Sequence, residues 1–409
     1  AGVLVNNYTP DETSPVVTGF DLDMDTARLT IRFSETVNGN SFRPAQITLQ
    51  NTDSTSALIS DESHSLSAAS VLEAAEINTT LVVLLSDADM DEMKNVPTLV
   101  SAEGNTFMSI ASGTFSDMNS RPLGLINSTS AMAVTTYTAD GTPPILTAVA
   151  VNMNRRLLTL NFDEPVDTDT LVYTSLKLQS GASSGTLIAL TGGNVTRGSD
   201  GMQIVVRMLD SDVHRITQAD NLAVDQTSSN LVVVGSGIED MASNGIVALP
   251  TTGAKPADAY TEDTTDPELV SFSIDMDAEE IVLTFNETMD VSSIAYTGIV
   301  LQAFSNSLVS YRLTTGALLE QTDDLTVRFS ILLVDLNELK VKNIGQTQAR
   351  SWLSMDSATI TDMNGQPVVP PVVGVTSMNA DDFTADTTAP VLRSFDLSVD
   401  NSTAELRFS

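Results

Sequence analysis

The sequence predicts an all-β protein made of tandem antiparallel β-sandwiches, each with about seven strands and one short helix. Three observations predict it: the chain repeats itself, apolar residues alternate with polar ones, and Gly, Asn and Asp punctuate the short apolar segments. With 42% hydrophobic and 18% charged residues, the 409-residue chain can bury a core in each repeat despite a formal charge of −34.

Three sequence blocks define the repeat. A proline-initiated strand recurs at Pro15, Pro144, Pro267 and Pro390, at spacings of 129, 123 and 123 residues. A Phe-x-Glu block and an Asp-Met block recur in register with it, at Glu35, Glu164 and Glu287 and at Asp117, Asp240 and Asp362. Three anchors in register over three copies indicate common structural units.

The anchors divide the chain into repeats. We expect residues 1–10 to be the tail of a preceding repeat, followed by repeats at 11–139, 140–262 and 263–385 and by the start of a fourth at 386–409. Because the chain begins and ends inside a repeat, we expect it to be a segment of a longer array.

Each repeat opens with a predicted β-hairpin. In the first, residues 20–24 and 29–33 carry apolar side chains at every second position, and residues 272–276 and 281–285 do the same in the third. Further strands are predicted at 47–50, 81–85 and 131–138, with 176–179 and 299–302 as the later counterparts of the first of these. This density of short strands favours a sandwich with Greek-key connections.

One short helix interrupts the strands of each repeat. Asp89 with Glu92 and Asp335 with Glu338 have the spacing of capping boxes, which predicts helices beginning at these aspartates. In the second repeat, Asp212 is followed three residues later by Arg215, so the box is absent there.

Composition excludes several classes of function. An acidic chain of pI about 4.1 lacks the basic surface that nucleic-acid binding needs. The absence of cysteine and the presence of only two histidines remove thiol chemistry and most zinc or iron sites. No apolar run is long enough to span a membrane. We do not expect an enzyme, since the acids recur in every repeat and only one tryptophan, Trp352, could serve as a sugar platform.

The motifs carry a resemblance. The Thr- and Pro-rich linker, the segment Phe33-Ser34-Glu35-Thr36-Val37 and the segment from Ala111 to Asn119 resemble bacterial Ig-like repeats of surface-layer proteins and adhesins, and the general plan is similar to that of cadherin arrays. The resemblance implies Ig-like sandwiches in an extracellular rod. The cadherin motifs Asp-x-Asn-Asp-Asn and Leu-Asp-Arg-Glu are absent, so no cadherin calcium stoichiometry is carried over.

Acidic residues are predicted to gather at the poles of each sandwich. In an Ig-type sandwich the linker, the loop after the second strand and the loop before the last strand share one pole, which brings three acids together. The sets are Asp11 (or Glu12), Glu35 and Asp117; Asp140, Glu164 and Asp240; and Asp263, Glu287 and Asp362. The helix-start acids Asp89, Asp212 and Asp335 are expected at the opposite pole, facing the next repeat. Ca²⁺ prefers such oxygen ligands, so we expect calcium between repeats.

A structural interpretation of the same acids stays open. The aspartates at 117, 240 and 362 are also suited to turns, and those at 89, 212 and 335 to helix caps. The recurrent glutamate could instead accept hydrogen bonds from backbone amides. Asp21, Asp23 and Asp25 imitate a calcium loop but lack the Gly and distal Glu of an EF-hand, which favours outward-facing strand positions.

The sequence therefore predicts a structural segment of a large extracellular or cell-surface protein, forming the rod of an adhesin stalk, surface layer or filament that calcium stiffens. Its expected partners are neighbouring repeats of the same chain, laterally associated chains, or cell-surface glycans and proteins. The alternative is a carbohydrate- or protein-binding Ig-like module of a secreted protein, since loops at a sandwich pole can bind ligands.

Overall fold

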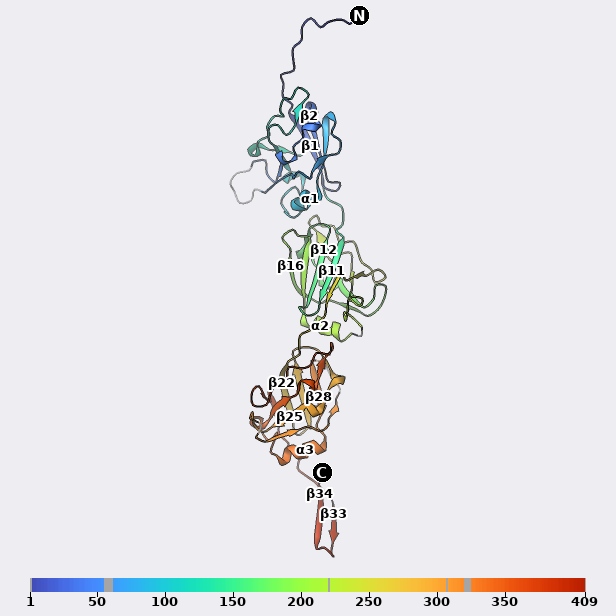
Figure 1. The fold of residues 1–409 in the computed structure, drawn as a ribbon, viewed down its shortest axis with the longest axis vertical. Coiled ribbons are helices and arrows are strands. Elements are labelled where there is room, and N and C mark those ends of the chain that lie inside the picture. The colour runs from blue at the N-terminus through green and yellow to red at the C-terminus, as the bar shows by residue number, and fades with distance from the viewer. Residues whose placement is uncertain (1, 55–61, 220, 307, 320–324, 409) are drawn as a thin grey trace. The chain divides into compact units, whose positions relative to one another are not determined.

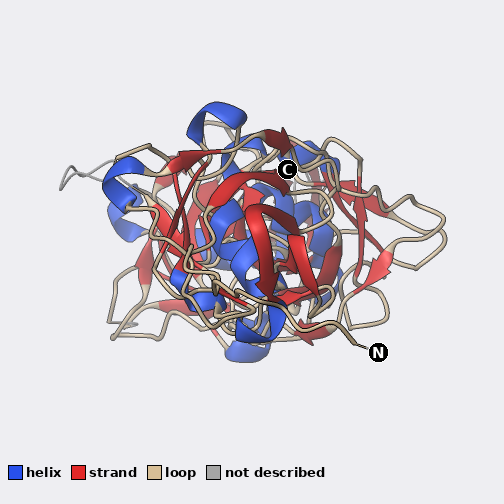
Figure 2. Cartoon of the chain, turned by 90° about the horizontal axis from the view of Figure 1, so that it is seen from above, coloured by secondary structure: helices blue, strands red, loops and turns tan. Residues whose placement is uncertain are grey.

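The computed structural model in Figure 1 describes residues 2–54, 62–219, 221–306, 308–319 and 325–408. Strands and loops make up most of the chain, and helical turns are short (Figure 2). Two compact units are formed, one from residues 1–209 with 225–260 and the other from 210–224 with 261–409. The predicted repeat boundaries stay a prediction, but each predicted repeat contains its own pair of large sheets.

Two sheets form the first sandwich of the first unit. One has the order β10-β1-β2-β6-β5, with β8 also paired to β2, and the other has the order β4-β3-β7-β9. The strands are β1 (Val17–Asp23), β2 (Arg28–Asn38), β3 (Ile47–Gln50), β4 (Ser63–Ser65), β5 (Val71–Leu72), β6 (Ile77–Leu84), β7 (Phe107–Ile110), β8 (Ser116–Asp117), β9 (Met132–Ala133) and β10 (Thr136–Thr138).

The second sandwich of that unit repeats the plan. Its sheets have the orders β16-β17-β12-β11-β21 and β15-β14-β18-β20, and β13 pairs with β19. The strands are β11 (Leu146–Asn152), β12 (Leu157–Phe162), β13 (Val166–Asp167), β14 (Leu176–Gln179), β15 (Leu187–Ala189), β16 (Gly193–Arg197), β17 (Gln203–Met208), β18 (Asn230–Val233), β19 (Glu239–Asp240), β20 (Lys255–Pro256) and β21 (Ala259–Thr261), the last of which ends one residue beyond the unit.

The second unit holds the third sandwich and a terminal hairpin. The sheet orders are β27-β28-β23-β22-β32, β26-β25-β29-β31, β24-β30 and β33-β34. The strands are β22 (Leu269–Asp275), β23 (Glu280–Phe285), β24 (Met289–Asp290), β25 (Ile299–Gln302), β26 (Ser310–Arg312), β27 (Ala317–Leu318), β28 (Thr326–Ser330), β29 (Trp352–Met355), β30 (Thr361–Asp362), β31 (Met378–Asn379), β32 (Asp382–Thr384), β33 (Leu392–Ser398) and β34 (Thr403–Phe408).

The first strand of each sandwich pairs on both sides. β1 runs antiparallel to β2, with Phe20 opposite Ile31, and parallel to β10, with Asp23 opposite Thr138. β22 makes the same two kinds of pairing with β23 and β32. The last strand of a sandwich thus closes against its first, and the architecture is an all-β, Ig-like sandwich.

Alternating side chains build the cores as the sequence predicts. Phe20, Leu22 and Met24 are buried in the first sandwich, and Phe272, Ile274 and Met276 take the equivalent places in the third. The strands predicted at 47–50, 176–179 and 299–302 have these bounds in the structure. The single strand predicted at 131–138 is wrong, because β9 pairs with β7 in one sheet whereas β10 pairs with β1 in the other.

In the part of the chain that the structure describes, three short α-helices accompany the sandwiches, α1 (Asp87–Lys94), α2 (Asp210–Thr217) and α3 (Leu333–Val341). They begin earlier than predicted. In α1 the N-cap is Ser86, whose hydroxyl accepts from the amide of Asp89, and the cap residue of α3 is Leu332, so neither Asp89 nor Asp335 is the N-cap. No helix in the described part of the chain is long and apolar enough to cross a membrane.

Candidate cation pockets and the junction between repeats

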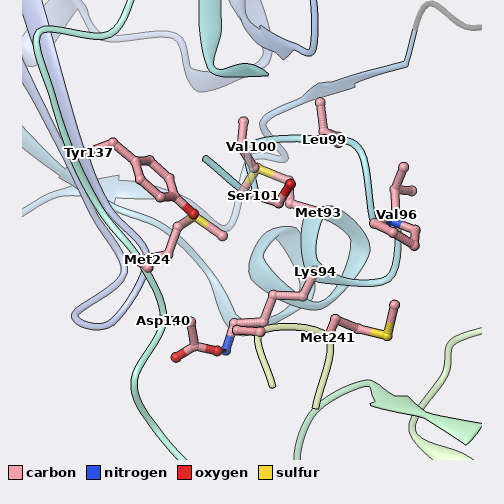
Figure 3. Close-up of a pocket in the computed structure, with 13 residues that line it drawn as sticks. Met24, Met93, Lys94, Val96, Leu99, Val100, Ser101, Tyr137, Asp140 and Met241 are labelled. Carbon is pink, nitrogen blue, oxygen red and sulfur yellow. Dashed lines mark ion pairs between the residues drawn. The ribbon is translucent and has the colours of Figure 1, made fainter. Parts of the chain in front are cut away.

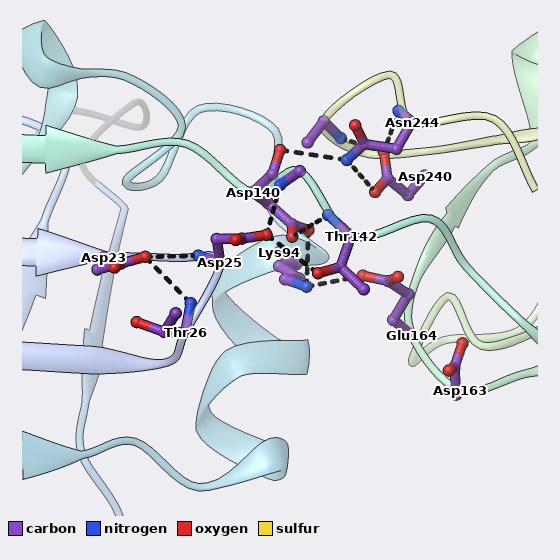
Figure 4. A network of polar contacts seen from close by, with 12 residues as sticks. Asp23, Asp25, Thr26, Lys94, Asp140, Thr142, Asp163, Glu164, Asp240 and Asn244 are labelled. Atoms are coloured by element: carbon purple, nitrogen blue, oxygen red, sulfur yellow. Dashed lines mark hydrogen bonds and ion pairs between the residues drawn. The ribbon is translucent and has the colours of Figure 1, made fainter.

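Three acids meet at one pole of the second sandwich. Asp140 follows β10 in the linker, Glu164 lies in the bend between β12 and β13, and Asp240 ends β19. One carboxylate oxygen of each lies within 4.8 Å of those of the other two, and Glu164 and Asp240 are buried (Figure 4). We call these residues the second-repeat pocket. The structure thus brings together the acids that the sequence places at this pole.

A lysine of the first repeat fills this pocket. Lys94, the last residue of α1, places its Nζ 2.7 Å from Oδ2 of Asp140 and 2.7 Å from Oε2 of Glu164. Only 15% of the Lys94 side chain is exposed. Glu164 is therefore held by an ammonium group, a partner that neither sequence interpretation foresaw.

The charges of the pocket are unequal, with three carboxylates around one ammonium. Burial raises the pKa of Glu164 to about 7; Lys94 opposes this shift, and Asp140 and Asp240 reinforce it. Burial lowers the pKa of Lys94, but its hydrogen bonds to Asp140 and Glu164 outweigh burial and raise it overall. Both groups thus hold protons more tightly, because excess negative charge in a dry site favours any added positive charge.

Each loop aspartate also serves as a turn residue. Oδ1 of Asp240 accepts from the amides of Ala242 and Asn244, at 2.8 and 2.7 Å. Asp117 and Asp362 accept from the amides two and four residues later in the same way. The residue three after the aspartate has positive φ in all three loops, and it is Ser120, Ser243 or Gly365. The turn interpretation therefore accounts for Oδ1 of each aspartate, and in Asp240 the second oxygen also accepts from Nδ2 of Asn244, at 2.8 Å.

The first sandwich has an equivalent first-repeat pocket of Asp11, Glu35 and Asp117, whose oxygens also lie within 4.8 Å of one another. Glu35 lies where the pairing of β2 with β6 is interrupted, between Arg32 and Val37. Desolvation, with the charges of Asp11 and Asp117, raises the pKa of Glu35. Among the described residues no lysine or arginine forms an ion pair with these acids, and the guanidinium Nε of Arg121 donates to the backbone oxygen of Asp11.

The third set, Asp263, Glu287 and Asp362, is looser. Within the described part of the chain, the oxygens of these residues do not all come within 4.8 Å of one another. Asp362 is nevertheless buried, and its desolvation together with the charge of Asp263 raises its pKa. Thr217 takes the place of Lys94 when the helices are aligned on Asp89 and Asp212, and its hydroxyl contacts that of Thr288 at 3.2 Å.

The helix aspartates are hydrogen-bond acceptors. Asp89 is buried and accepts from the hydroxyls of Ser67, Ser70 and Ser86, the amide of Ser67 and Nε2 of His64. These bonds overcome desolvation and lower the pKa of Asp89 to about 2.

Asp335 repeats this arrangement. It accepts from the hydroxyl of Tyr311 and from amides and a hydroxyl of the segment Thr314–Thr315. Asp212 pairs with Arg215 at 3.0 Å. Hydrogen bonds from neighbouring protein groups therefore satisfy the carboxylates of Asp89 and Asp335. The proposed cation sites include none of the three helix aspartates.

A second contact holds the linker at the same junction. Asp25, in the turn between β1 and β2, accepts from the amide of Gly141 and the hydroxyl of Thr142. Asp277, in the turn between β22 and β23, accepts likewise from Thr387 and Thr388. Lys340 at the end of α3 lies 2.7 Å from Asp386, as Lys94 does from Asp140. Asp25 is thus a linker anchor and not an outward-facing strand residue.

A small pocket of about 110 Å³ lies beside Lys94 (Figure 3). Met24, Met93, Tyr137 and Met241 contribute apolar surface to it, and the lysine side chain extends along it to Asp140. Burial, with the charge of Asp140, raises the pKa of Tyr137 to about 12. The cavity is too small for a typical organic ligand, so we assign it to packing around the lysine.

Comparisons with known proteins find similarity only among solved structures. No family model and no curated protein matches the chain. It is similar to the FN1–FN3 domains of chicken CNTN1, at 11% identity, 90% coverage of this chain, 99% of that chain and a TM-score of 0.21. It is similar to domains 1–6 of the surface layer protein SbsC, at 9% identity, 97% and 57% coverage and a TM-score of 0.20.

The I67–I69 I-band fragment of titin is a further match, with 8% identity, coverage of 92% of this chain and 100% of that chain, and a TM-score of 0.19. All three are multidomain chains. At these identities and scores, the matches carry no argument about function.

Proposed function

We propose that the chain is a structural segment of a large extracellular or cell-surface protein, in which consecutive sandwiches are joined end to end through a recurring junction. One observation carries the proposal. A turn aspartate and a helix lysine of one repeat hold the linker to the next, at Asp25 with Lys94 and again at Asp277 with Lys340.

The contacts at the junction favour a fixed orientation of the first and second sandwiches over a flexible connection between them. A flexible linker would be solvated, whereas Asp140 has both a buried ion pair and a place in a three-acid pocket. Buried ion pairs add little net stability, because desolvation offsets most of their attraction, but breaking one is costly. Such a pair therefore disfavours other orientations of the two sandwiches.

The finer form of the proposal is an adhesin stalk, surface layer or extracellular filament stiffened by calcium. The resemblance to Ig-like repeats of surface-layer proteins and adhesins supports it. A charge of −34 over three repeats keeps such chains soluble, and screening or cation binding would be needed before they pack side by side.

Small-angle scattering tests the array. A single globule of 409 residues would have a radius of gyration of about 22 Å from the size scaling. Three sandwiches of about 40 Å each in line, from strand lengths plus loops, give about 35 Å. A value near 22 Å would reject the linear arrangement.

Variants then separate a stiff junction from a loose one. Asp25→Ala combined with Lys94→Ala removes both anchors and should broaden the distribution of interatomic distances. Lys177→Ala, which removes a lysine of β14 that takes no part in the junction, is the matched control. Equal distributions for the control and the double variant would show that the anchors do not set the orientation.

A ligand-binding role is a second candidate, favoured by one aromatic surface. Phe304 and Trp352 line an open depression of about 450 Å³ with Ser305 and Asn306, and the guanidinium of Arg350 stacks over Phe304 at 4.7 Å. Aromatic faces beside polar groups suit sugars. Because Trp352 is the only tryptophan, its fluorescence reports directly on binding during titration with a glycan panel, and Phe304→Ala, which keeps the tryptophan, should abolish the response. An absence of any spectral change would argue against this role.

A further inference from the structure

The first- and second-repeat pockets contain the same types of acid, but only the second is paired with a lysine in the described part of the chain. In the second, the ammonium of Lys94 lies within 2.7 Å of two carboxylates. In the first, oxygens of Asp11, Glu35 and Asp117 also lie within 4.8 Å of one another, and within the described residues no cationic side chain pairs with them. The second pocket therefore shows that three such acids accommodate a cationic group, and the first gathers the same types of acid without a lysine.

The first-repeat pocket contains a buried carboxylate oxygen that lacks a hydrogen-bond donor among the described residues. Asp117 is 3% exposed, and its Oδ1 accepts from the amides of Asn119 and Arg121. Its Oδ2 is fully buried and receives no hydrogen bond from the residues that the structure describes. The equivalent oxygen of Asp240 accepts from Nδ2 of Asn244, a donor that repeat 1 replaces with Arg121, which turns to the backbone of Asp11. A buried carboxylate oxygen without a donor is costly unless a ligand satisfies it.

We propose that Asp11, Glu35 and Asp117 bind a divalent cation, with Ca²⁺ as the preferred ion, and that Lys94 is a built-in substitute for that ion in the second-repeat pocket. Three carboxylates supply hard oxygen ligands, and water completes the coordination of Ca²⁺. The exposed position of Asp11 favours Ca²⁺ over Mg²⁺, because Ca²⁺ tolerates irregular, adaptable ligand sets. The inference rests on the proposed array function and assigns the ion to one pole of the first sandwich. Its test measures ion binding, whereas the test of the array measures the radius of gyration.

Calorimetric titration of the whole chain with CaCl₂ in 0.15 M NaCl is the first test. We expect Glu35→Gln and Asp117→Asn each to bind one Ca²⁺ fewer per chain than the wild type. Asp117→Asn keeps an acceptor oxygen for the loop amides, so the turn should persist. Glu73→Gln is the matched control, since it removes an equal charge from the same repeat at a residue paired with Arg28. Unchanged stoichiometry in both pocket variants, or no binding by the wild type, would overturn the site.

The reciprocal test adds a site. Lys94→Ala removes the ammonium from the second-repeat pocket, and we expect this variant to bind one Ca²⁺ more than the wild type. Lys94→Ala combined with Glu164→Gln should lose that extra ion. A Lys94→Ala protein that melts cooperatively but binds no additional Ca²⁺ would overturn the equivalence of lysine and metal. Scattering of the wild type judges the array separately, so failure of the site and failure of the array are distinguishable.

Discussion

Asp89 and Glu164 are both buried acids, yet their surroundings are opposite. Asp89 is enclosed by hydroxyl, amide and imidazole donors, and its pKa falls to about 2. Glu164 shares one ammonium with Asp140 and lies beside Asp240, and its pKa rises to about 7. The difference teaches that burial of an acid does not identify a cation site. The balance of donors and competing acids around it does.

The largest expected effect comes from removing the well-satisfied acid. Asp89→Ala leaves several hydroxyl and amide donors without their acceptor and should lower the free energy of unfolding by about 3 to 4 kcal/mol. Denaturant unfolding followed by circular dichroism measures it. Asp87→Ala removes an exposed acid of the same helix turn and should change stability by less than about 0.5 kcal/mol. Similar losses for both variants would contradict the role given to Asp89.

The pH dependence of Asp89 follows from its lowered pKa. Between pH 4 and 2 the unfolded chain binds the proton and the folded chain does not, so stability falls as the pH falls through this window. The contribution is about 2 kcal/mol, from a shift of nearly two pKa units. It should be complete above pH 4 and absent in Asp89→Ala.

Glu164 should show the reverse dependence. Its folded pKa of about 7 lies above the ordinary 4.5, so the folded state binds more protons between these values and stability falls as the pH rises. Glu164→Gln removes this slope and should gain about 1 to 2 kcal/mol relative to the wild type between pH 5 and pH 8; the neutral amide is a weaker partner for Lys94, which offsets part of the gain. Unfolding curves at both pH values provide the measurement, and parallel behaviour of the two proteins would reject the excess-charge account.

The smallest effect concerns the junction that lacks the lysine. Thr217→Lys places an ammonium at the position that corresponds to Lys94, beside Thr288, which follows Glu287 in the chain. It should raise the free energy of unfolding by less than about 1 kcal/mol, because desolvation offsets most of the new attraction. Thr217→Met has a similar stem without the charge. If thermal melting gives the same midpoint for both variants, the third set of acids does not act as an equivalent pocket.

Sequence patterns predicted the features that depend on local order or on repetition. β3, β14 and β25 follow from alternating apolar residues, and the pocket of Asp140, Glu164 and Asp240 follows from placing recurrent acids at one pole. The sequence prediction does not include Lys94, because it rests on recurrent acidic residues alone. Aligning the helices on Asp89 and Asp335 nevertheless places a lysine five residues later in both, at 94 and at 340.

The sequence does not reveal the hydrogen-bonding role of Asp89, and the reason differs from that for Lys94. Its partners His64, Ser67 and Ser70 come from β4 and the segment that follows it, 19 to 25 residues earlier, so only the folded chain reveals that they surround the carboxylate. Likewise, residues 131–138 form one continuous strand-like segment in sequence but divide between two sheets, which local periodicity does not report.

The parallel pairing of β1 with β10 has a consequence for synthesis. Asp23 meets Thr138, so the outer edge of the first hairpin stays open until about 115 more residues have been added. At ribosomal rates of about 5 to 20 residues per second this takes roughly 6 to 23 s, which is long for an unprotected strand edge. Each repeat therefore completes its sandwich only when its own last strand emerges, and the array matures one sandwich at a time from the N-terminal end.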